Sequence, residues 1–405
     1  MNMLKHLLVA ATLLAAGSAQ AQSAAQSGNL LRSADDQIPT ALQVRSGPAA
    51  DMERRPIATS WAIDADAALD ARPTPFTRES REYWRDASAA ELQAGVSLAI
   101  SAKGGLLRVS PREGSAAIDA SRLVFSSNGQ AIANARAIGN VADADALRAA
   151  GMDVPDGSVI LRLSDEVDAG QLQLLAPDAN GDYLIHVFEP NSRIVLDVQA
   201  GKDSVIAGES LRIRAHVHGA TLERVGGLLS SPRGHSQPAE FVRQADGGYV
   251  ATVTPDPAHA GGHGLWEAHV FAGAHDGRLD VQRDARTAFA VSVATARLDG
   301  RIQRVPASAK GDGLRVRIGV ESASASRYQL AGVLYATTAR GLRPVAVGHA
   351  ASWLDAGAGT IELHFDQDAL AASGAGAPFE LRDLRLIDQS DMGLIERRER
   401  AAVIR

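Results

Sequence analysis

The sequence predicts an all-β protein built from tandem β-sandwich domains, and three observations carry this prediction. Hydrophobic and polar residues alternate through several short segments, which is the period of a half-buried strand. The 38 glycines and 16 prolines of the 405 residues divide these segments as turns do. The strands of the central region, residues 194–293, are evenly spaced within about 100 residues, as in immunoglobulin-like sandwiches. With 45% hydrophobic residues, the chain can bury a core in each of several domains.

The first 21 residues have the features of a Sec-type signal peptide. Lys5 gives a basic start, an apolar run extends from Leu7 to Ala16, and small residues stand at Ala19 and Ala21. The run is shorter than the roughly 20 residues that span a bilayer, so we expect cleavage after Ala21. No later segment is long and apolar enough to cross a membrane. The sequence therefore predicts a protein of the periplasm or the extracellular space, without a membrane span.

Residues 22–75 are predicted to be a linker or a loosely ordered leader. Alanine, serine, aspartate and proline dominate this segment, and its scattered apolar residues show no period. Trp61 either packs on a neighbouring domain or is exposed, and the pattern around it leaves both alternatives open.

The first folded unit, residues 76–193, is predicted to be mostly β with one short helix. Its first clear strand is GGLLRVSP (104–111). Asn128-Gly129 and Asn180-Gly181 lie between apolar segments and predict tight hairpins, because both residue types accept positive φ angles. Residues 142–151 (ADADALRAAG) predict the helix, with a glycine at its end.

The second unit, residues 194–296, is predicted to be an immunoglobulin-like sandwich without a disulfide, since the chain has no cysteine. Strict alternation assigns one side of each strand to the core. The residues predicted to face this core are Leu211, Ile213, Ala215, Val217, Tyr249, Ala251, Val253, Trp266, Ala268, Val270, Phe289, Val291 and Val293.

The third unit, residues 297–405, is predicted to be a second immunoglobulin-like sandwich. A short helix capped by Asp366 interrupts its strands. The predicted strands are 313–320, 328–338, 342–354, 359–365 and 378–388, followed by a last strand in MGLIERRERAAVIR.

Several of these segments together resemble an exported bacterial family named domain of unknown function 4785. They are SREYW (80–84), ELQAGVSL (91–98), GGLLRVSP (104–111), DGGYVATVTP (246–255), GLWEAHVFAGAHDG (264–277) and PFELRDLRLIDQSDMGLIERRERA (378–401). The resemblance covers about residues 76–405. It implies an N-terminal family domain followed by immunoglobulin-like domains, and it brings no catalytic residues.

The central domain holds seven of the eleven histidines, which makes a metal site one hypothesis. His216 and His218 lie on one face of a strand, an arrangement that zinc or copper sites use. His259 and His263 lie in the loop PDPAHAGGHG (255–264) and are the other candidate ligands. Two arginines extend the face of the first pair and disfavour a cation there. The alternative is a solvated surface that responds weakly to pH.

A calcium loop is a second hypothesis, formed by Asp178, Asn180, Asp182 and Glu189. Their oxygens stand at the first, third, fifth and twelfth places of a segment, as in an EF-hand loop. Tyr183 occupies the place that requires glycine, and a strand pattern follows instead of a helix. The alternative is the simple hairpin turn already predicted from Asn180-Gly181.

The sequence shows none of the motifs that identify common enzyme classes. There is no Gly-x-Ser-x-Gly elbow, no HExxH, no phosphate-binding loop and no GxGxxG after a strand. The absence of cysteine excludes thiolate catalysis. The formal net charge of −6 argues against nucleic acid as a partner.

These observations favour a non-enzymatic binding or adhesion-type protein of the cell envelope, with a protein or a glycan as its partner. A secreted hydrolase or metal-dependent enzyme is one alternative, and a periplasmic accessory or chaperone-like protein is another. No cofactor is expected, with zinc, copper and calcium as the ions to consider.

Overall fold

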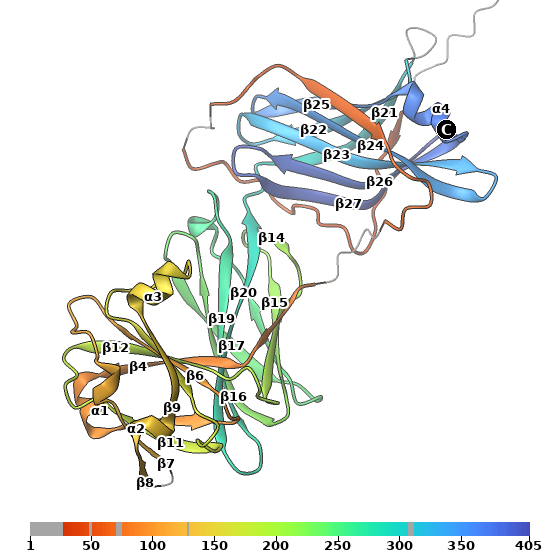
Figure 1. Ribbon diagram of the computed structural model, residues 1–405. Helices are drawn as coiled ribbons and strands as arrows, with labels where there is room; N and C mark the ends of the chain where they lie inside the picture. Colours follow the sequence, from red (N-terminus) through yellow and green to blue (C-terminus); the bar gives the residue numbers. More distant parts are fainter. Residues whose placement is uncertain (1–26, 48–50, 70–74, 128, 307–311) are drawn as a thin grey trace, which may run out of the picture.

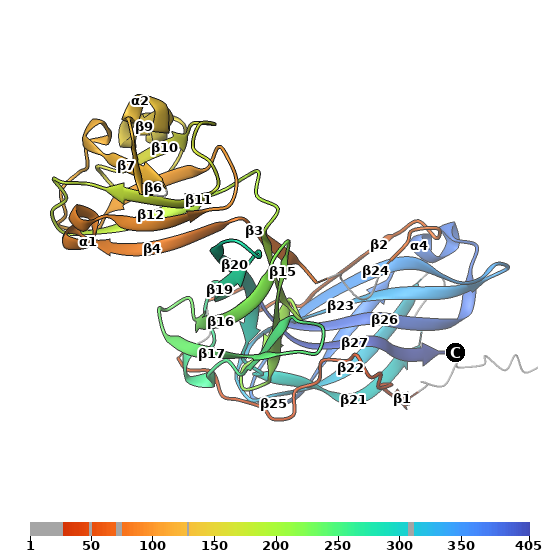
Figure 2. The same cartoon turned by 90° about the horizontal axis from the view of Figure 1, so that it is seen from below.

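The computed structural model describes residues 27–47, 51–69, 75–127, 129–306 and 312–405. Over these ranges the chain is mainly β-structure, arranged as three sandwiches (Figure 1, Figure 2). Each sandwich encloses a hydrophobic core of its own. The all-β prediction of tandem sandwiches is therefore confirmed. The predicted signal peptide, residues 1–21, lies outside the described residues.

The N-terminal sandwich packs a five-stranded sheet against a four-stranded one. The first has the order β4 (Glu82–Ser88), β12 (Asp182–Phe188), β6 (Leu106–Pro111), β10 (Val159–Leu163) and β9 (Ile138–Asp143). The second has the order β5 (Val96–Ile100), β11 (Gly170–Leu175), β7 (Val124–Ser127) and β8 (Gln130–Ile132). The helical segments are α1 (Ala89–Ala94), η1 (Ala120–Arg122), α2 (Asn134–Ala137) and α3 (Ala144–Ala149). Leu98, Leu107 and Phe125 are fully buried in the core of this sandwich.

Helix α3 forms where the sequence predicts the helix of the first domain. The Oδ1 atom of Asp143 accepts the backbone N–H of Ala146 at 2.9 Å and caps the N-terminus. Gly151 follows the helix with φ at +82°, a conformation that ends helices and favours glycine. In the described parts of the chain, no helix has the length and hydrophobicity needed to cross a membrane.

The two Asn-Gly dipeptides have different surroundings. β7 and β8 form an antiparallel hairpin with Ser127 opposite Gln130, which confirms the first predicted hairpin, although Asn128 lies outside the described residues. The second predicted hairpin is wrong, because β11 and β12 belong to different sheets and residues 176–181 connect the two layers. A dipeptide indicates a turn, but it does not decide which strand the next segment pairs with.

The middle sandwich is one continuous sheet that folds over itself. Its order is β14 (Ser204–Ile206), β20 (Asp280–Ser292), β19 (Trp266–His275), β16 (Thr221–Ser230), β17 (Ser236–Arg243), β18 (Tyr249–Val253), β15 (Leu211–His218), β13 (Val195–Ala200) and β3 (Thr77–Ser80). β17 belongs to both layers, since residues 236–240 pair with β16 and residues 241–243 pair with β18. A 3₁₀ turn, η2 (Pro257–His259), follows β18.

The alternation predicted for the central strands largely holds. In β15 the four predicted core residues are buried, and the residues between them are exposed or half-buried. Trp266 and Phe289 lie in the core and are only 2% and 1% exposed. Val291 and Val293 are half-buried instead of buried, because the chain leaves the middle sandwich at this point.

The C-terminal sandwich also has two layers. One sheet has the order β1 (Ser27–Asn29), β21 (Ala296–Val305), β22 (Leu314–Ser322) and β25 (Gly357–Phe365). The other has the order β2 (Ile57–Ala62), β24 (Gly341–Leu354), β23 (Ser326–Thr338), β26 (Gly376–Asp388) and β27 (Gly393–Ile404). Asp366 precedes α4 (Gln367–Ala372) as predicted, but its carboxylate accepts the hydroxyl of Ser60 at 2.8 Å and no helix N–H.

The segment predicted as a loosely ordered leader, residues 22–75, forms part of the C-terminal sandwich over its described residues 27–47 and 51–62, which corrects that prediction. β1 and β2 are edge strands, one in each sheet, and pair with β21 and β24. Trp61 stacks on His349 with the ring centroids 5.0 Å apart. The leader lacks a hydrophobic period because edge strands are held mainly by backbone hydrogen bonds and expose most side chains.

Candidate functional site: a groove between the first two sandwiches

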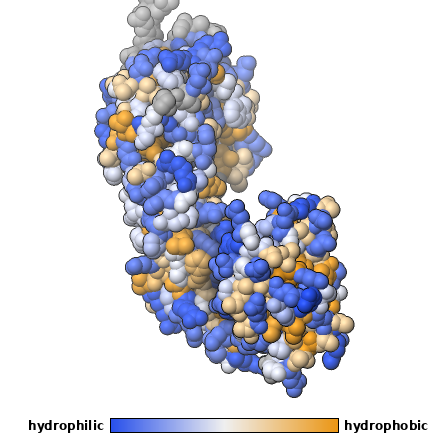
Figure 3. Space-filling view, turned by 90° about the vertical axis from the view of Figure 1, so that its left-hand side faces the viewer, coloured by the Kyte–Doolittle hydropathy of each residue, from blue (hydrophilic) through white to orange (hydrophobic). Residues whose placement is uncertain are grey.

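The N-terminal and middle sandwiches meet along β4 and β20. The chain enters β4 directly from β3, which is an edge strand of the middle sandwich. The backbone N–H of Trp84 in β4 donates to the Oδ2 atom of Asp284 in β20 at 2.9 Å. This docking covers part of the outer face of β20, β19 and β16, and the remainder becomes the floor of a groove. Figure 3 shows one face of the molecule, on which hydrophilic and hydrophobic residues are mixed.

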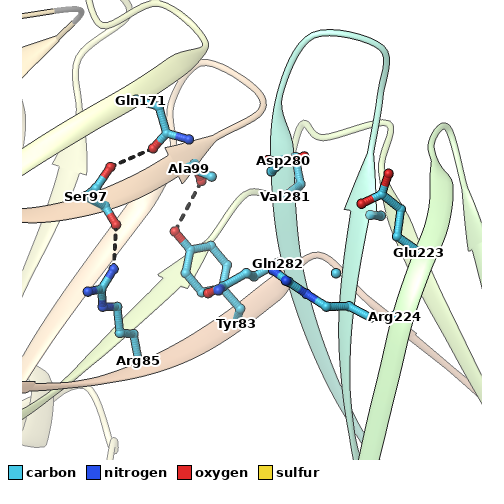
Figure 4. Close-up of a pocket in the computed structure, with 12 residues that line it drawn as sticks. Tyr83, Arg85, Ser97, Ala99, Gln171, Glu223, Arg224, Asp280, Val281 and Gln282 are labelled. Atoms are coloured by element: carbon cyan, nitrogen blue, oxygen red, sulfur yellow. Dashed lines mark hydrogen bonds between the residues drawn. The ribbon is translucent and has the colours of Figure 1, made fainter. Parts of the chain in front are cut away.

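Two connected hollows make up the groove, with volumes of about 210 and 390 Å³. Arg224, Gly273 and Gln282 line both hollows and so join them. Figure 4 shows the first hollow, with side chains of β4, β5 and β11 on one side and those of β16 and β20 on the other. Both sandwiches therefore contribute to one site.

Strand register determines the floor of the groove. On the outer face of the middle sandwich, Gly273 lies opposite Arg224 on one side and Gln282 on the other. A Cβ atom on Gly273 would lie 2.6 Å from the Nε atom of Arg224, so the absence of a side chain lets Arg224 lie across the strand. Phe271 is 37% exposed on the same face and adds an apolar surface.

Three polar side chains of the groove are free to bind a ligand. Glu223, Arg224 and Gln282 make no side-chain hydrogen bond or ion pair with the described residues. On the opposite wall, Arg85 donates to the carbonyl of Ser97 at 2.9 Å, and the Ser97 hydroxyl donates to the Oε1 atom of Gln171 at 2.7 Å. One wall is thus internally bonded, and the other offers unsatisfied donors and acceptors.

A buried ion pair holds the two sandwiches together beside the groove. The Nη2 atom of Arg283 lies 2.8 Å from the Oε2 atom of Glu189, and both side chains are fully buried. Arg283 also donates to the hydroxyls of Ser101 and Ser192 at 2.9 Å each and to the carbonyl of Ile194 at 3.0 Å. Because every partner is satisfied, this network fixes the angle between the sandwiches and keeps the groove preformed.

Two titratable groups around Trp84 have shifted pKa values. Burial raises the pKa of Asp284 to about 6, although the N–H of Trp84 partly opposes this. Burial lowers the pKa of His269 to about 4, and the nearby charge of Arg286 adds to the effect. The Nε2 atom of His269 is buried without a hydrogen-bond partner among the described residues. Both groups are therefore held preferentially in their neutral forms.

We expect the stability of the wild type, relative to the Asp284→Asn variant, to decrease as the pH rises from about 4 to about 6. The folded pKa lies above the ordinary value of 3.8, so the folded state binds the proton more strongly than the unfolded state in this range. At about 1.4 kcal/mol per pKa unit, the decrease should be about 2–3 kcal/mol. Urea unfolding of both proteins at pH 4, 5, 6 and 7 measures it. Parallel stability curves for the two proteins would contradict this pKa.

The structure does not bring the four predicted metal-binding histidines together. His216 and His218 lie side by side on β15, with ring centroids 4.9 Å apart. The Nε2 atom of His218 lies 2.8 Å from the Oδ2 atom of Asp197, so this histidine already has a carboxylate partner. His259 lies at the other end of the strands and stacks on His235 with a centroid distance of 3.6 Å.

The predicted calcium ligands do not converge either. Asp178 pairs with Arg122 at 2.6 Å, whereas the carboxylate of Glu189 is buried against Arg283. β12 lies between Asp182 and Glu189 and separates them by about 20 Å. A strand between two proposed ligands excludes a single coordination sphere, and this corrects the calcium hypothesis.

The sequence pattern does not predict the groove residues, because they come from six strands, β4, β5, β11, β16, β19 and β20, in different parts of the chain. One signal was present: Arg283 and Asp284 are adjacent charges in the middle of a strand of the central domain. Adjacent charges place one ionic side chain on each face of a strand, so one of them must enter a core or an interface.

Comparisons with known proteins follow the same division of the chain. The N-terminal domain model of a domain of unknown function (DUF4785) matches residues 48–189, and the C-terminal domain model of DUF4785 matches residues 295–405. No curated protein matches the chain.

Among solved structures, the chain is similar to a DUF4785 family protein from Legionella pneumophila. The TM-score is 0.72 at 20% identity, and the alignment covers 91% of this chain and 98% of that chain. At this identity the likeness concerns the fold. A tetra-tandem repeat of a large adhesion protein has a TM-score of 0.20 at 13% identity, over 76% of this chain and 70% of that chain. Alpha-2-macroglobulin from Escherichia coli has a TM-score of 0.20 at 14% identity, over 73% of this chain and 22% of that chain.

Scores of 0.20 carry no structural argument. The family rests on the two family models. The two models together match more than half of the chain. The resemblance noted in the sequence is confirmed: the chain belongs to the DUF4785 family.

Proposed function

We propose that the protein is an exported, non-enzymatic binding protein of the cell envelope, and that the groove between its first two sandwiches is the ligand site. The observation that carries the proposal is the group of unpartnered polar side chains, Glu223, Arg224 and Gln282, beside the exposed ring of Phe271. The features of residues 1–21 support export. Detection of the processed chain in periplasmic or medium fractions tests that part of the proposal.

The chemistry of the groove suits a glycan chain. Sugar hydroxyls both donate and accept hydrogen bonds. The side chains of Glu223, Arg224 and Gln282 offer a carboxylate, a guanidinium and an amide in the same hollow. Trp84 and Phe271 line the second hollow and provide the aromatic surface that such sites combine with polar groups. Two joined hollows accept a chain more readily than a single enclosed cavity does.

Preorganisation supports the same proposal. Because the buried Arg283–Glu189 pair fixes the two sandwiches, binding does not have to order the interface first. The Arg85–Ser97–Gln171 hydrogen bonds hold the opposite wall in place. Removing a ligand contact made by Glu223, Arg224 or Gln282 should therefore lower the binding affinity, with no added cost for ordering the interface.

We expect the Arg224→Ala variant to bind the glycan selected on an array at least about 10-fold more weakly than the wild type. Loss of a hydrogen bond to a charged group is worth about 1.5–3 kcal/mol, and about 1.4 kcal/mol corresponds to a factor of ten. The Gln282→Ala variant loses only a neutral hydrogen bond, worth about 0.5–1.5 kcal/mol, and should bind about 2- to 10-fold more weakly. Isothermal titration with the mature protein measures the affinities. Arg212→Ala is the control, because Arg212 is exposed on the other layer of the middle sandwich.

Two outcomes would count against the proposal. A glycan that binds all three variants and the wild type equally would place the binding site elsewhere. An array without any signal, combined with capture of an envelope protein that depends on Arg224, would make the ligand a protein.

One observation favours the hydrolase alternative, namely the raised pKa of Asp284 beside Trp84 in the second hollow. A carboxyl group held neutral near pH 6 is the form that a general acid of a glycosidase needs. Turnover of glycoside substrates by the wild type, together with its loss in Asp284→Asn, would replace the binding proposal with this one.

A further inference from the structure

We infer that the middle sandwich carries a site for a divalent transition metal ion, formed by His235, Asp256 and His259. One ligand atom of each residue lies within 4.8 Å of those of the other two. The three residues come from two loops, His235 from the connection between β16 and β17, and the other two from the segment that follows β18. Two imidazoles and one carboxylate are a donor set that zinc accepts, with a water molecule as the fourth ligand.

The two loops are held together by bonds that do not use the proposed ligand atoms. Arg233 donates from Nη2 to the carbonyl of Ala260 at 3.0 Å and so joins one loop to the other. The backbone N–H of His235 donates to the hydroxyl of Ser231 at 3.2 Å, which closes the first loop. Contacts outside the proposed ligand atoms therefore hold the two loops next to each other.

The two carboxylate oxygens of Asp256 have different neighbours. Its Oδ1 atom accepts the backbone N–H of Ala258 at 2.9 Å, as the cap of η2. Its Oδ2 atom points toward His259, 3.8 Å from the Nε2 atom. The cap fixes the orientation of the side chain, so the second oxygen is presented to the histidines.

The two imidazoles lie in contact. The rings of His235 and His259 are stacked with an interplanar angle of 11° and a centroid distance of 3.6 Å. Metal ions bind the neutral imidazole through a ring nitrogen, and both rings present their nitrogens in the same cluster. Zinc bonds of about 2.0–2.1 Å require the ligand atoms to approach one another to about 3.4 Å. All three residues are only half-buried, which leaves their side chains room to rotate toward one another.

This site differs from the groove in position and chemistry. β16 carries Glu223 and Arg224 in the groove and ends at Ser230, just before the loop that holds His235. The six residues of strand after Arg224, 225–230, separate Arg224 from the start of this loop by about 20 Å. A bound ion would join the β16–β17 and β18–β19 loops at one end of the middle sandwich.

Zinc titration of the mature, tag-free and chelator-treated protein tests the inference. We expect one equivalent of zinc to bind the wild type, and the His235→Ala, His259→Ala and Asp256→Asn variants to bind at least about 10–100-fold more weakly, the range known for outer-shell partners alone. The His216→Ala/His218→Ala double variant and the His263→Ala variant are matched controls, and both should bind zinc like the wild type. Calorimetry gives the affinity, and the melting temperature with and without zinc gives a second readout.

Three results would overturn the inference. The first is the absence of saturable heat when zinc is titrated into the wild type. The second is a zinc affinity of the three ligand variants equal to that of the wild type. The third is loss of zinc binding in either control. The three ligand residues are half-buried and lie in loops, so their substitution should leave the fold intact. Unchanged melting temperatures of the zinc-free variants would show that each variant is folded.

Discussion

Replacing Arg283 by methionine is expected to lower the free energy of unfolding by about 3–5 kcal/mol. The substitution removes the cation that is paired with the buried carboxylate of Glu189, while the N–H groups of Ser101 and Ala102 still hold that carboxylate in the interface. A buried charge without its partner is among the largest single costs in a folded protein. Urea unfolding, followed by tryptophan fluorescence, measures the loss.

The companion change Glu189→Gln should recover much of the loss in the Arg283→Met background, because a neutral amide can still accept the two N–H groups. Arg278→Met serves as a control in the turn before β20, where the side chain is exposed, and it should change stability by less than about 0.5 kcal/mol. The Arg283→Met variant should also weaken ligand binding, because the groove depends on the angle between the sandwiches that Arg283 fixes. Equal stabilities of Arg283→Met and Arg278→Met would show that the ion pair does not hold the two sandwiches.

Replacing Arg45 by methionine is expected to destabilise the C-terminal sandwich by about 3 kcal/mol. Arg45 pairs with Asp388 and Asp391, and these ion pairs are one of the contacts that fix the leader segment to this sandwich. Asp388 is 2% exposed and is also hydrogen-bonded by Ser326 at 2.6 Å, so its carboxylate stays buried after the substitution. Thermal unfolding of the mature chain provides the measurement.

Proteolysis distinguishes a local effect from a general one. In Arg45→Met, a protease should cut the segment between β1 and β2 faster than in the wild type, because β1 and β2 are edge strands that depend on this contact. Arg32→Met is the control, since Arg32 is exposed in the same segment. Unchanged cutting and stability in Arg45→Met would mean that backbone pairing of β1 and β2 alone fixes the leader.

The sequence predicts the strands well where one face is buried. In β15, the alternation of Leu211 and Ile213 with arginines identifies both the strand and its inner face, because a pleated strand has a period of two. The helix α3 follows from its capping aspartate and its final glycine. These signals are local, so they need no knowledge of the partner strand.

The prediction fails where pairing partners are distant. Asn180-Gly181 indicates a turn, but β12 pairs with β4 and β6 and not with β11. The leader strands show no period, because β1 and β2 lie at sheet edges. Of the predicted metal ligands, only His259 belongs to a cluster, and its partners His235 and Asp256 were not selected, since loop proximity is not visible in spacing.

The sequence by itself determined the class of the protein: its strands, the inner faces of most of them, the three-domain series and the family. The strands, their inner faces and the domain series follow from short-range periodicity and turn chemistry, which act within a few residues, whereas the family follows from the resemblance of several segments. The tertiary structure alone decided that the leader completes the C-terminal sandwich, that Arg283 meets Glu189, and that Trp84 and Arg224 line one groove. Such contacts join segments that are up to several hundred residues apart, and they depend on how each layer packs against the next.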